Sequence, residues 1–366
     1  MAPPHVAGPV VVIGAGAVGS YLGGVLAVGG RDVWLLGRHG GGVAEPEGLV
    51  LERRNRPATA LVRRIGHQSA GPAEVALVIL AVKVFDLESA LAAASRWPDA
   101  PLLTVQNGIG AEDVAAAART SPLLAASLTT AVELIPGGVA ARRTGGIGIA
   151  GMRGADPALL KELAAAFSAG GLPARVYADG TAMKWSKLLA NLIANATSAL
   201  LDMDPRSVYA DPYGFELERR QLREAIAVMR REGHKPVILP GAHVGLLLTG
   251  LRLPAWLARP IMSRAVGAAR GGKPPSLHGR LRGGGEGPTE APWLNGAVAA
   301  VGRRLGMAVP VNTGLEVLVE AASADPRILD DYTCQPDQLL AAVFAAAASA
   351  GAASVAPGGA SSPTPR

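Results

Sequence analysis

The chain has 366 residues, more than one hydrophobic core usually supports, so two domains are expected. Its single cysteine, Cys334, excludes an intrachain disulfide and a cysteine-based metal cluster, and the six histidines lack metal-ligand spacing. The net charge of +6 is spread along the chain without basic runs interleaved with aromatic residues, so no nucleic-acid partner is implied. With no evident targeting segment and no apolar stretch of bilayer length, we expect a soluble, cytoplasmic protein without a membrane partner.

The first motif is a glycine-rich turn. A short β-branched run, PVVVI, is followed by GAGAVGSYLGG, in which Gly14, Gly16 and Gly19 have the G-x-G-x-x-G spacing. The first glycine permits a tight turn, the second lets the backbone approach a pyrophosphate, and the third lets helix pack on strand. Because the turn lies between a predicted strand and a predicted helix, we expect these glycines, with Ala17 and Val18, to contact a dinucleotide.

The second predicted strand, 32–36, ends at Gly37-Arg38-His39. An NAD site normally offers an acidic residue here, which accepts hydrogen bonds from the ribose 2′-hydroxyl. Arg38 instead suits a 2′-phosphate, so the sequence predicts a preference for NADP(H). The alternative is an ordinary surface arginine, with the acid supplied from elsewhere.

Two further buried strands, predicted at 75–82 and 102–105, are followed by Lys83 and by Asn107 in a Gln-Asn-Gly turn. In open parallel sheets ligands lie at the carboxyl ends of the strands, so both side chains are expected at the edge that holds the glycine turn. Either residue is also compatible with merely starting a loop. Other elements predicted in this region are a loop and short polar strands over 40–64, strands at 125–130, 146–150 and 174–177, and a helix at 157–169.

Beyond residue 179 the strand signals stop and helical patterns begin. The stretch KWSKLLANLIANATSALL, residues 184–201, is predicted as one helix in which Lys187, Asn191 and Asn195 form a slanted polar stripe among leucines. The stripe either faces a pocket that satisfies an amine and two amides or lies solvated on a surface helix.

The glycine turn, the strand ends AVK and QNG, the helix WSKLLANLIAN and the later PSL and TEAPWLNGAVAAVGRRLGMAVPVN segments resemble, in that order, the ketopantoate reductase family. The resemblance covers roughly residues 9 to 325. It implies an α/β Rossmann-type dinucleotide-binding domain over 1–179, then an all-α domain of the 6-phosphogluconate dehydrogenase C-terminal type over 180–344. It also implies NADPH-dependent reduction of a 2-oxo acid, first of all 2-dehydropantoate to pantoate in pantothenate and coenzyme A biosynthesis.

A lysine can supply the proton and the positive charge that a developing alkoxide requires. The resemblance implies these roles: Lys187 as the catalytic lysine, Glu290 as its acidic partner, Asn191, Asn195 and Ser276 as substrate-binding residues, and Asn107 between cofactor and substrate. The residue types alone also allow a solvated Glu290 and a Ser276 that only caps a helix.

Other features leave alternatives open. Leu277 and Arg280 depart from the Met and the acidic residue that the resemblance leads us to expect, and the 279–288 loop is longer. The exact substrate therefore stays open, as do a related dehydrogenase acting on another 2-oxo or hydroxy acid and a non-catalytic NADP(H)-binding regulator. The 236–262 segment, which fits the family poorly, suits a wider pocket, a subunit contact or a membrane surface. The tail over 345–366 begins as a possible helix end and is predicted to be disordered. A homodimer is the common oligomer, but the sequence does not reveal one.

Overall fold

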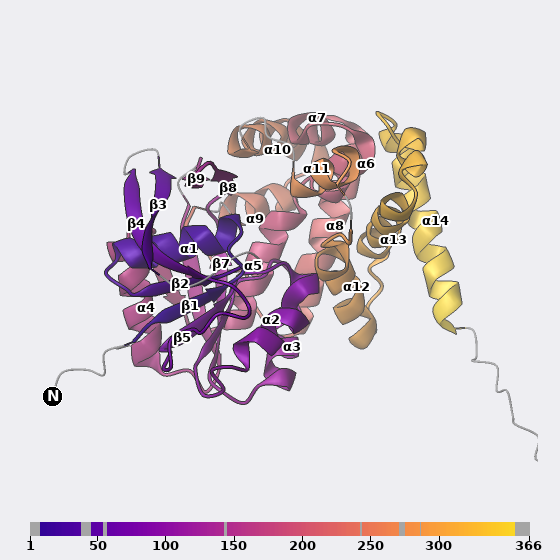
Figure 1. The fold of residues 1–366 in the computed structure, drawn as a ribbon. Coiled ribbons are helices and arrows are strands. Elements are labelled where there is room, and N and C mark those ends of the chain that lie inside the picture. The colour runs from indigo at the N-terminus through magenta and orange to yellow at the C-terminus, as the bar shows by residue number, and fades with distance from the viewer. Residues whose placement is uncertain are drawn as a thin grey trace, which may run out of the picture. The chain divides into compact units, whose positions relative to one another are not determined.

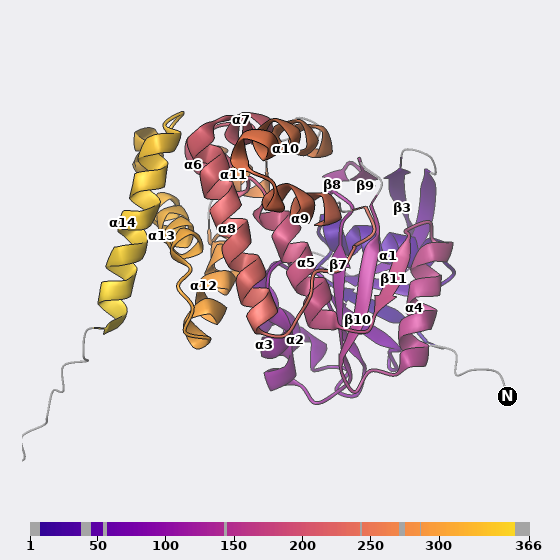
Figure 2. The same cartoon turned by 180° about the vertical axis from the view of Figure 1, so that it is seen from behind.

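The computed structural model describes residues 8–37, 45–53, 57–142, 145–241, 244–270, 275–285 and 287–355. They form two compact units, the first made of Met1–Asn191 and Glu232–Thr249 and the second of Leu192–Arg231 and Gly250–Arg366 (Figures 1 and 2). The predicted order of an α/β region and a helical region is confirmed. The predicted boundary near residue 180 differs from this spatial division, because the chain enters the second unit at Leu192 and returns to the first for residues 232–249.

The first unit is built on an 11-stranded sheet in the order β11-β10-β7-β6-β5-β1-β2-β4-β3-β9-β8. Its middle, from β7 to β2, is parallel, with β1 between β2 and β5, so the strand order reverses at β1. Around this middle the sheet adds three antiparallel pairs, β10 with β7, β3 with β4 and β8 with β9. The pair of β3 and β4 lies largely in the 40–64 stretch, which was predicted only as a loop and short polar strands. The strands are β1 (Val10–Ile13), β2 (Val33–Leu36), β3 (Pro46–Arg53), β4 (Ala58–Ile65), β5 (Leu77–Leu80), β6 (Leu102–Thr104), β7 (Leu123–Leu128), β8 (Val132–Ile135), β9 (Gly138–Ala141), β10 (Ile147–Arg153) and β11 (Ala174–Tyr177).

Helices cover both faces of this sheet. Side chains of α1 and α4, including Leu22 and Phe167, share one core with Ala126 of β7. Because neighbouring strand residues point to opposite faces, Ala125 faces a second core, which contains Met183 of α5. The helices of the first unit are α1 (Ala17–Val28), the short 3-10 helix η1 (Val84–Asp86), α2 (Leu87–Ala94), α3 (Ala111–Ala118), α4 (Pro157–Ala169) and α5 (Gly180–Leu192).

An irregular segment over residues 232–241, here called the strap, lies along α5. Trp185 Nε1 donates to Glu232 Oε2 at 2.9 Å, and Val237 N donates to Ser186 Oγ at 2.8 Å. Leu239 is buried in the same core as Met183. The strap therefore completes the burial of α5 in the first unit.

The second unit consists of helices around an apolar core of Leu, Val and Ala side chains. Within it α8 contacts α7, α12, α13 and α14. Asn295 Nδ2 donates to Gln221 Oε1 at 3.1 Å and to Asn312 Oδ1 at 3.0 Å, so these buried amides satisfy one another. The elements are α6 (Ala196–Leu201), α7 (Pro205–Ala210), α8 (Pro212–Arg231), α10 (Ala255–Arg270), α11 (Ser276–Arg282), η2 (Ala291–Trp293), α12 (Asn295–Arg304), α13 (Pro310–Ala324), η3 (Pro326–Asp331) and α14 (Pro336–Val355); α9 (Val244–Arg252) contains the passage from the first unit.

The predicted continuous helix over 184–201 is wrong. After the end of α5 the chain turns through Ala194, whose φ of 48° lies in the left-handed region, and only then begins α6. Glu218 of α8, fully buried, accepts hydrogen bonds from Ala194 N at 2.8 Å and Thr197 Oγ1 at 2.7 Å. This buried carboxylate satisfies the backbone at the break, which explains why an apolar, helix-forming sequence is interrupted here.

The tail also differs from its prediction. Because α14 continues to Val355, the disorder predicted from residue 345 is wrong as far as 355, and residues from 356 on lie outside the described part. None of the helices, over the residues described, is long and apolar enough to cross a membrane.

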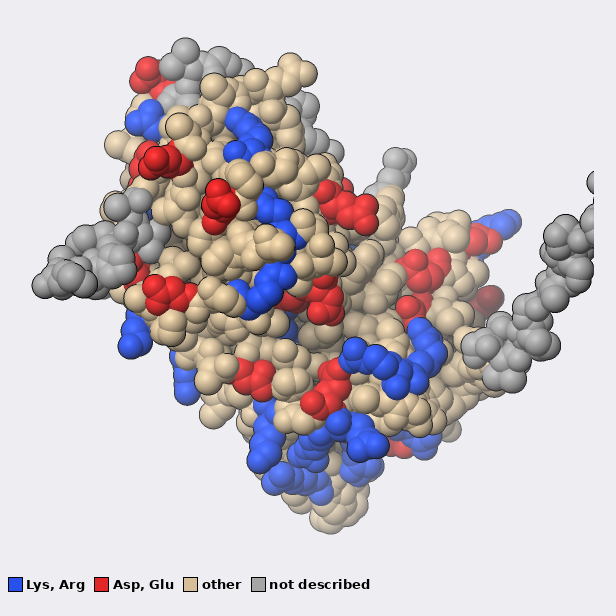
Figure 3. Space-filling model, turned by 90° about the horizontal axis from the view of Figure 1, so that it is seen from below, with Lys and Arg blue, Asp and Glu red and all other residues tan. Residues whose placement is uncertain are grey.

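The surface carries its positive charge unevenly. In Figure 3 Lys and Arg side chains crowd toward the lower edge of the view, whereas acidic side chains are scattered.

No Asp or Glu occurs in the sequence between Glu232 and Glu286. This stretch includes α10, where Trp256 and Ile261 are 76% and 42% exposed. The 236–262 segment thus supplies most of the strap and an apolar helix surface.

Candidate active site

The glycine turn has the backbone that its sequence predicts. Gly14 has a φ of 103°, and a Cβ there would stand 2.8 Å from the carbonyl carbon of Ala81. A Cβ on Gly19 would overlap the carbonyl oxygen of Gly14, so helix α1 approaches the turn as closely as only glycine allows. A Cβ on Gly16 would meet no described atom within 4 Å, so the turn is open above Gly16.

The open side of the turn suits a pyrophosphate. Ala17 and Val18 are the first residues of α1, and a helix leaves its first backbone N–H groups free for an anion. The first turn carries no acidic side chain that would compete for them. At the end of β6, which is separated from β1 by β5, Gln106 Oε1 is buried without a hydrogen-bond partner among the described residues. This oxygen is an acceptor that a ligand donor can satisfy. These residues fit a dinucleotide.

Lys83 and Asn107 follow adjacent strands at the same edge. Lys83 comes directly before η1, in the segment that continues from Ala81 beside Gly14, and its side chain is exposed. Asn107 follows β6, which pairs with β5, and is exposed as well. The structure therefore places both residues at the edge where the glycine turn lies. Arg38, expected at the end of β2, lies outside the described residues.

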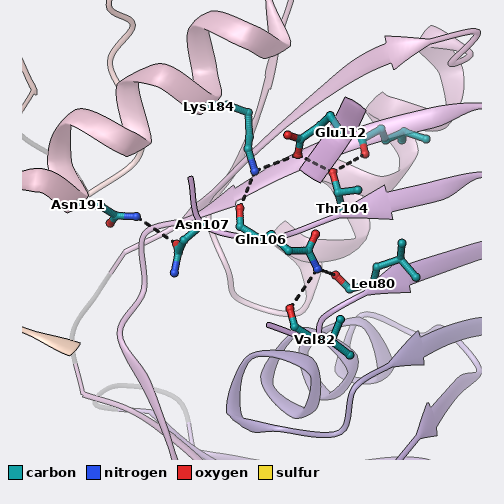
Figure 4. A network of polar contacts seen from close by, with 9 residues as sticks. Leu80, Val82, Thr104, Gln106, Asn107, Glu112, Lys184 and Asn191 are labelled. Atoms are coloured by element: carbon teal, nitrogen blue, oxygen red, sulfur yellow. Dashed lines mark hydrogen bonds and ion pairs between the residues drawn. The ribbon is translucent and has the colours of Figure 1, made fainter. Parts of the chain in front are cut away.

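Helix α5 brings its polar face to this edge. Asn191 Nδ2 donates a hydrogen bond to Asn107 Oδ1 at 3.2 Å (Figure 4). Lys187 lies about one turn earlier on the same helix and is half-buried. Two of the three stripe residues thus share a helix that contacts the strand edge. Asn195, by contrast, lies after the break, at the N-cap of α6 in the second unit.

A second lysine of α5, not singled out from the sequence, is more deeply buried. Lys184 is 3% exposed, and its Nζ lies 2.6 Å from the carbonyl oxygen of Gln106 and 3.0 Å from Glu112 Oε1 (Figure 4). Glu112, in the first turn of α3, also accepts a hydrogen bond from Thr104 Oγ1 at 2.7 Å. The sequence signal was a lysine flanked by Met183 and Trp185 in an apolar run, which requires a buried counter-charge.

The remaining predicted residues lie in the second unit. Glu290 is half-buried and directly precedes η2. Thr289 before it is 2% exposed and donates a hydrogen bond to Glu320 of α13, which fixes this turn. Ser276 is exposed as the first residue of α11, directly after the N-cap residue Pro275.

The two arginines of the altered loop have different surroundings. Arg282 donates from Nε to Ala199 O at 2.8 Å and from Nη2 to Leu200 O at 2.7 Å, so it caps the carboxyl end of α6. Arg280 lies along the glycine-rich loop, its Nη1 3.2 Å from where a Cβ on Gly285 would stand. Arg282 therefore has a structural role, and Arg280 is the arginine that distinguishes this loop chemically.

A contact between a carboxylate and an imidazole lies at the start of α5. Asp179 accepts a hydrogen bond from Ala182 N at 2.8 Å, and its Oδ2 lies 2.7 Å from His234 Nδ1 of the strap. Burial acts to raise the pKa of Asp179, but the hydrogen bond from Ala182 and the contact with His234 outweigh it and lower the pKa. The aspartate is therefore ionised at neutral pH, and it caps α5 and holds the strap.

A mostly parallel sheet whose first strand leads through a glycine turn into a helix, followed by a helical unit, is the architecture of a Rossmann-type dinucleotide-binding protein. Two family models match the chain, "Ketopantoate reductase PanE/ApbA" over residues 10–152 and "Ketopantoate reductase PanE/ApbA C terminal" over residues 179–323. The chain belongs to the ketopantoate reductase family. As a member it is an enzyme that acts on a CH–OH group with a nicotinamide dinucleotide.

Individual relatives agree with this assignment. A 2-dehydropantoate 2-reductase from Halobacterium salinarum is 32% identical over 331 residues, which are 86% of this chain and 99% of the relative. The crystal structure of 2-dehydropantoate 2-reductase from Geobacter metallireducens has 26% identity and a TM-score of 0.70, covering 86% of this chain and 99% of that one. A D-mandelate dehydrogenase with NADH and anilino(oxo)acetate, 21% identical with a TM-score of 0.69, covers 87% of this chain and 99% of its own and shares the fold.

Proposed function

We propose that the protein reduces 2-dehydropantoate to pantoate with NADPH, the step that serves pantothenate and coenzyme A biosynthesis. The observation that carries the proposal is the hydrogen bond between Asn191 and Asn107, because it joins the helix of Lys187 to the strand edge of the glycine turn. Reduction of a carbonyl requires a proton donor beside the cofactor, and Lys187 on this helix would be that donor. The Halobacterium relative bears the name of this activity.

In the proposed reaction, residues of this chain donate the proton and bind the substrate. When bound, the nicotinamide supplies the hydride. Lys187 stabilises the developing alkoxide with its ammonium and donates the proton to the same oxygen. Glu290 orients Lys187 or accepts a hydrogen bond from a substrate hydroxyl. The substrate's carboxylate and hydroxyl groups bind to amide and hydroxyl side chains, namely Asn107, Asn191, Asn195 and Ser276.

The cofactor residues are proposed from the turn and from the sequence. The backbone of the turn and the start of α1 would hold the pyrophosphate, and Lys83 and Asn107 would contact the cofactor at the strand ends. Arg38 binds the 2′-phosphate, which gives a preference for NADPH. Arg38→Asp should reverse the ratio of kcat/KM for NADPH to that for NADH, and an unchanged ratio would refute this role.

The identity of the substrate is tested by following the fall in NADPH absorbance when purified protein is mixed with each candidate acid. We expect the highest kcat/KM with 2-dehydropantoate in a panel that also contains other branched 2-oxo acids and an aromatic one. A higher kcat/KM for another acid would assign a related dehydrogenase instead, and Arg280→Glu would test whether the altered loop selects it. Bound NADPH without turnover on any of these acids would refute reduction altogether.

We also propose a homodimer in the cytoplasm, without nucleic-acid or membrane partners. A structure of a ketopantoate reductase from Staphylococcus aureus, 18% identical with a TM-score of 0.65, is described as dimeric. Light scattering coupled to gel filtration checks the mass in solution, and a monomer mass at assay concentration would exclude the dimer.

A further inference from the structure

Three polar residues of α5 share one face. Lys184, Lys187 and Asn191 lie within about 60° of one another around the helix axis at about 100° per residue. Lys184 and Asn191 are the first and last of the three, about 10 Å apart along the axis. Lys187, the proposed proton donor, lies between them.

Both outer residues are attached to the loop that follows β6. Lys184 Nζ binds the carbonyl oxygen of Gln106 at 2.6 Å, and Asn191 Nδ2 binds the side chain of Asn107 at 3.2 Å (Figure 4). The carbonyl of Gln106 belongs to the peptide that carries the nitrogen of Asn107, so Lys184 fixes the peptide plane from which Asn107 projects. Two contacts, one on each side of Lys187, therefore fix the rotation of α5 about its axis and its position along that axis relative to this loop.

Burial of the charges of Lys184 and Glu112 costs desolvation free energy, which points to a role beyond stability. Lys184 and Glu112 are 3% and 6% exposed, and burial of an ion pair gains little net stability because desolvation offsets the attraction. Two apolar side chains of similar volume would often fold as well. What they would lack is a directed donor for Gln106 O, held in place by a carboxylate that Thr104 Oγ1 also binds at 2.7 Å.

We propose that Lys184 is a positioning residue, which through Glu112 and Gln106 O holds Lys187 at the cofactor edge. The proposal rests on the proposed function for the role of Lys187. A misplacement of about 1 Å can lower turnover about 10²-fold. Lys184 does not touch the reacting atoms, so its removal should lower the rate without abolishing the proton donor.

The decisive variant is Lys184→Met/Glu112→Leu, which removes both charges together. Thr104 Oγ1 keeps an acceptor in that variant, Leu124 O at 3.2 Å. We expect a midpoint of thermal unfolding within about 3 °C of wild type and a kcat about 10²-fold lower. The pH profile of kcat should keep its shape. The matched control is Lys161→Met on the exposed side of α4, which should leave all these quantities unchanged.

Amide hydrogen exchange supplies a readout that needs no turnover. We expect faster exchange in residues 107–110 and in the second half of α5 of the double variant, with the rest of the first unit unchanged. Wild-type kcat together with wild-type exchange would overturn the proposal. If the double variant instead loses the pH dependence of kcat, the proposal is overturned too, because Lys184 would then be the proton donor itself.

A second variant guards against loss of folding. Glu112→Gln keeps an acceptor for Thr104 and removes only the charge, and we expect a smaller drop in kcat with the same local increase in exchange. If this variant is indistinguishable from wild type in both measurements while the double variant does not fold, the pair is structural and the proposal fails. If the wild-type protein reduces no 2-oxo acid, the proposed function fails. In that case, unchanged hydrogen exchange at residues 107–110 in the double variant would separately refute the positioning role of Lys184.

Discussion

The side chain of Asn191 donates a hydrogen bond to Asn107 Oδ1 across 84 residues of sequence. Since each amide orients the other, Asn107→Ala and Asn191→Ala should not have additive effects on kcat/KM. We expect a coupling free energy of about 0.5–3 kcal/mol from the double-mutant cycle. Purely additive effects would show that the two amides act independently during the reaction.

Replacement of Lys187 should separate binding from chemistry. Lys187→Ala is expected to lower kcat about 10²–10⁴-fold, because a general acid contributes about that much. The dissociation constant for NADPH, measured by fluorescence titration, should stay near the wild-type value. Lys161→Ala is the matched control on the surface. Retained turnover in Lys187→Ala would remove this residue from the mechanism.

The glycine turn yields a contrast between two substitutions to alanine. At Gly19 the new Cβ would overlap the carbonyl oxygen of Gly14, so overpacking should destabilise the protein by about 1–3 kcal/mol. At Gly16 the Cβ meets no described atom within 4 Å, so stability should be retained. If the pyrophosphate lies above Gly16, however, NADPH affinity should fall about tenfold or more, about 1.4 kcal/mol. Thermal unfolding and titration together check both, and full affinity in Gly16→Ala would place the cofactor elsewhere.

The lowered pKa of Asp179 predicts a pH dependence of stability. A depressed carboxyl pKa stabilises the folded state above the pKa of the unfolded chain, about 3.9, and the stabilisation is lost as pH falls through the folded-state pKa. Because the side chain is 47% exposed, solvent screening keeps the effect at or below about 1 kcal/mol. Asp179→Asn should therefore unfold more easily than wild type at neutral pH, and the difference in midpoint should shrink as the pH falls below about 3.9 and through the folded-state pKa. A constant difference across this range would exclude the ionisation of Asp179 as its cause.

Local sequence determined the elements that depend on neighbours along the chain. The predicted helix at 157–169 and the predicted strand at 174–177 coincide with α4 and β11. The turn residues Gly14, Gly16 and Gly19 could be identified from their spacing, because each glycine has a separate predicted reason. The structure displays the steric requirement at Gly14 and Gly19 and leaves open space above Gly16.

Long-range contacts explain what the sequence did not reveal. The break after Leu192 depends on Glu218, whose buried carboxylate satisfies Ala194 N from another helix. The apolar periodicity of the 184–201 stretch does not indicate this break in the helix. Lys184 was missed for a related reason, since its partner Glu112 lies 72 residues earlier and only tertiary packing makes the pair visible.

The strap has a consequence for the order in which the protein can fold during synthesis. Residues 192–231 belong to the second unit, yet Leu239, which covers Met183, comes after them. A nascent chain that ends at residue 191 has every strand of the sheet but leaves part of α5 uncovered. The nucleotide-binding half therefore reaches its final stability only after the ribosome has also produced α6, α7 and α8. A fragment cut near residue 179, where the second family match begins, would lack α5 as well, so it should expose the apolar side chains of Ala125, Ala150 and Tyr177 and aggregate.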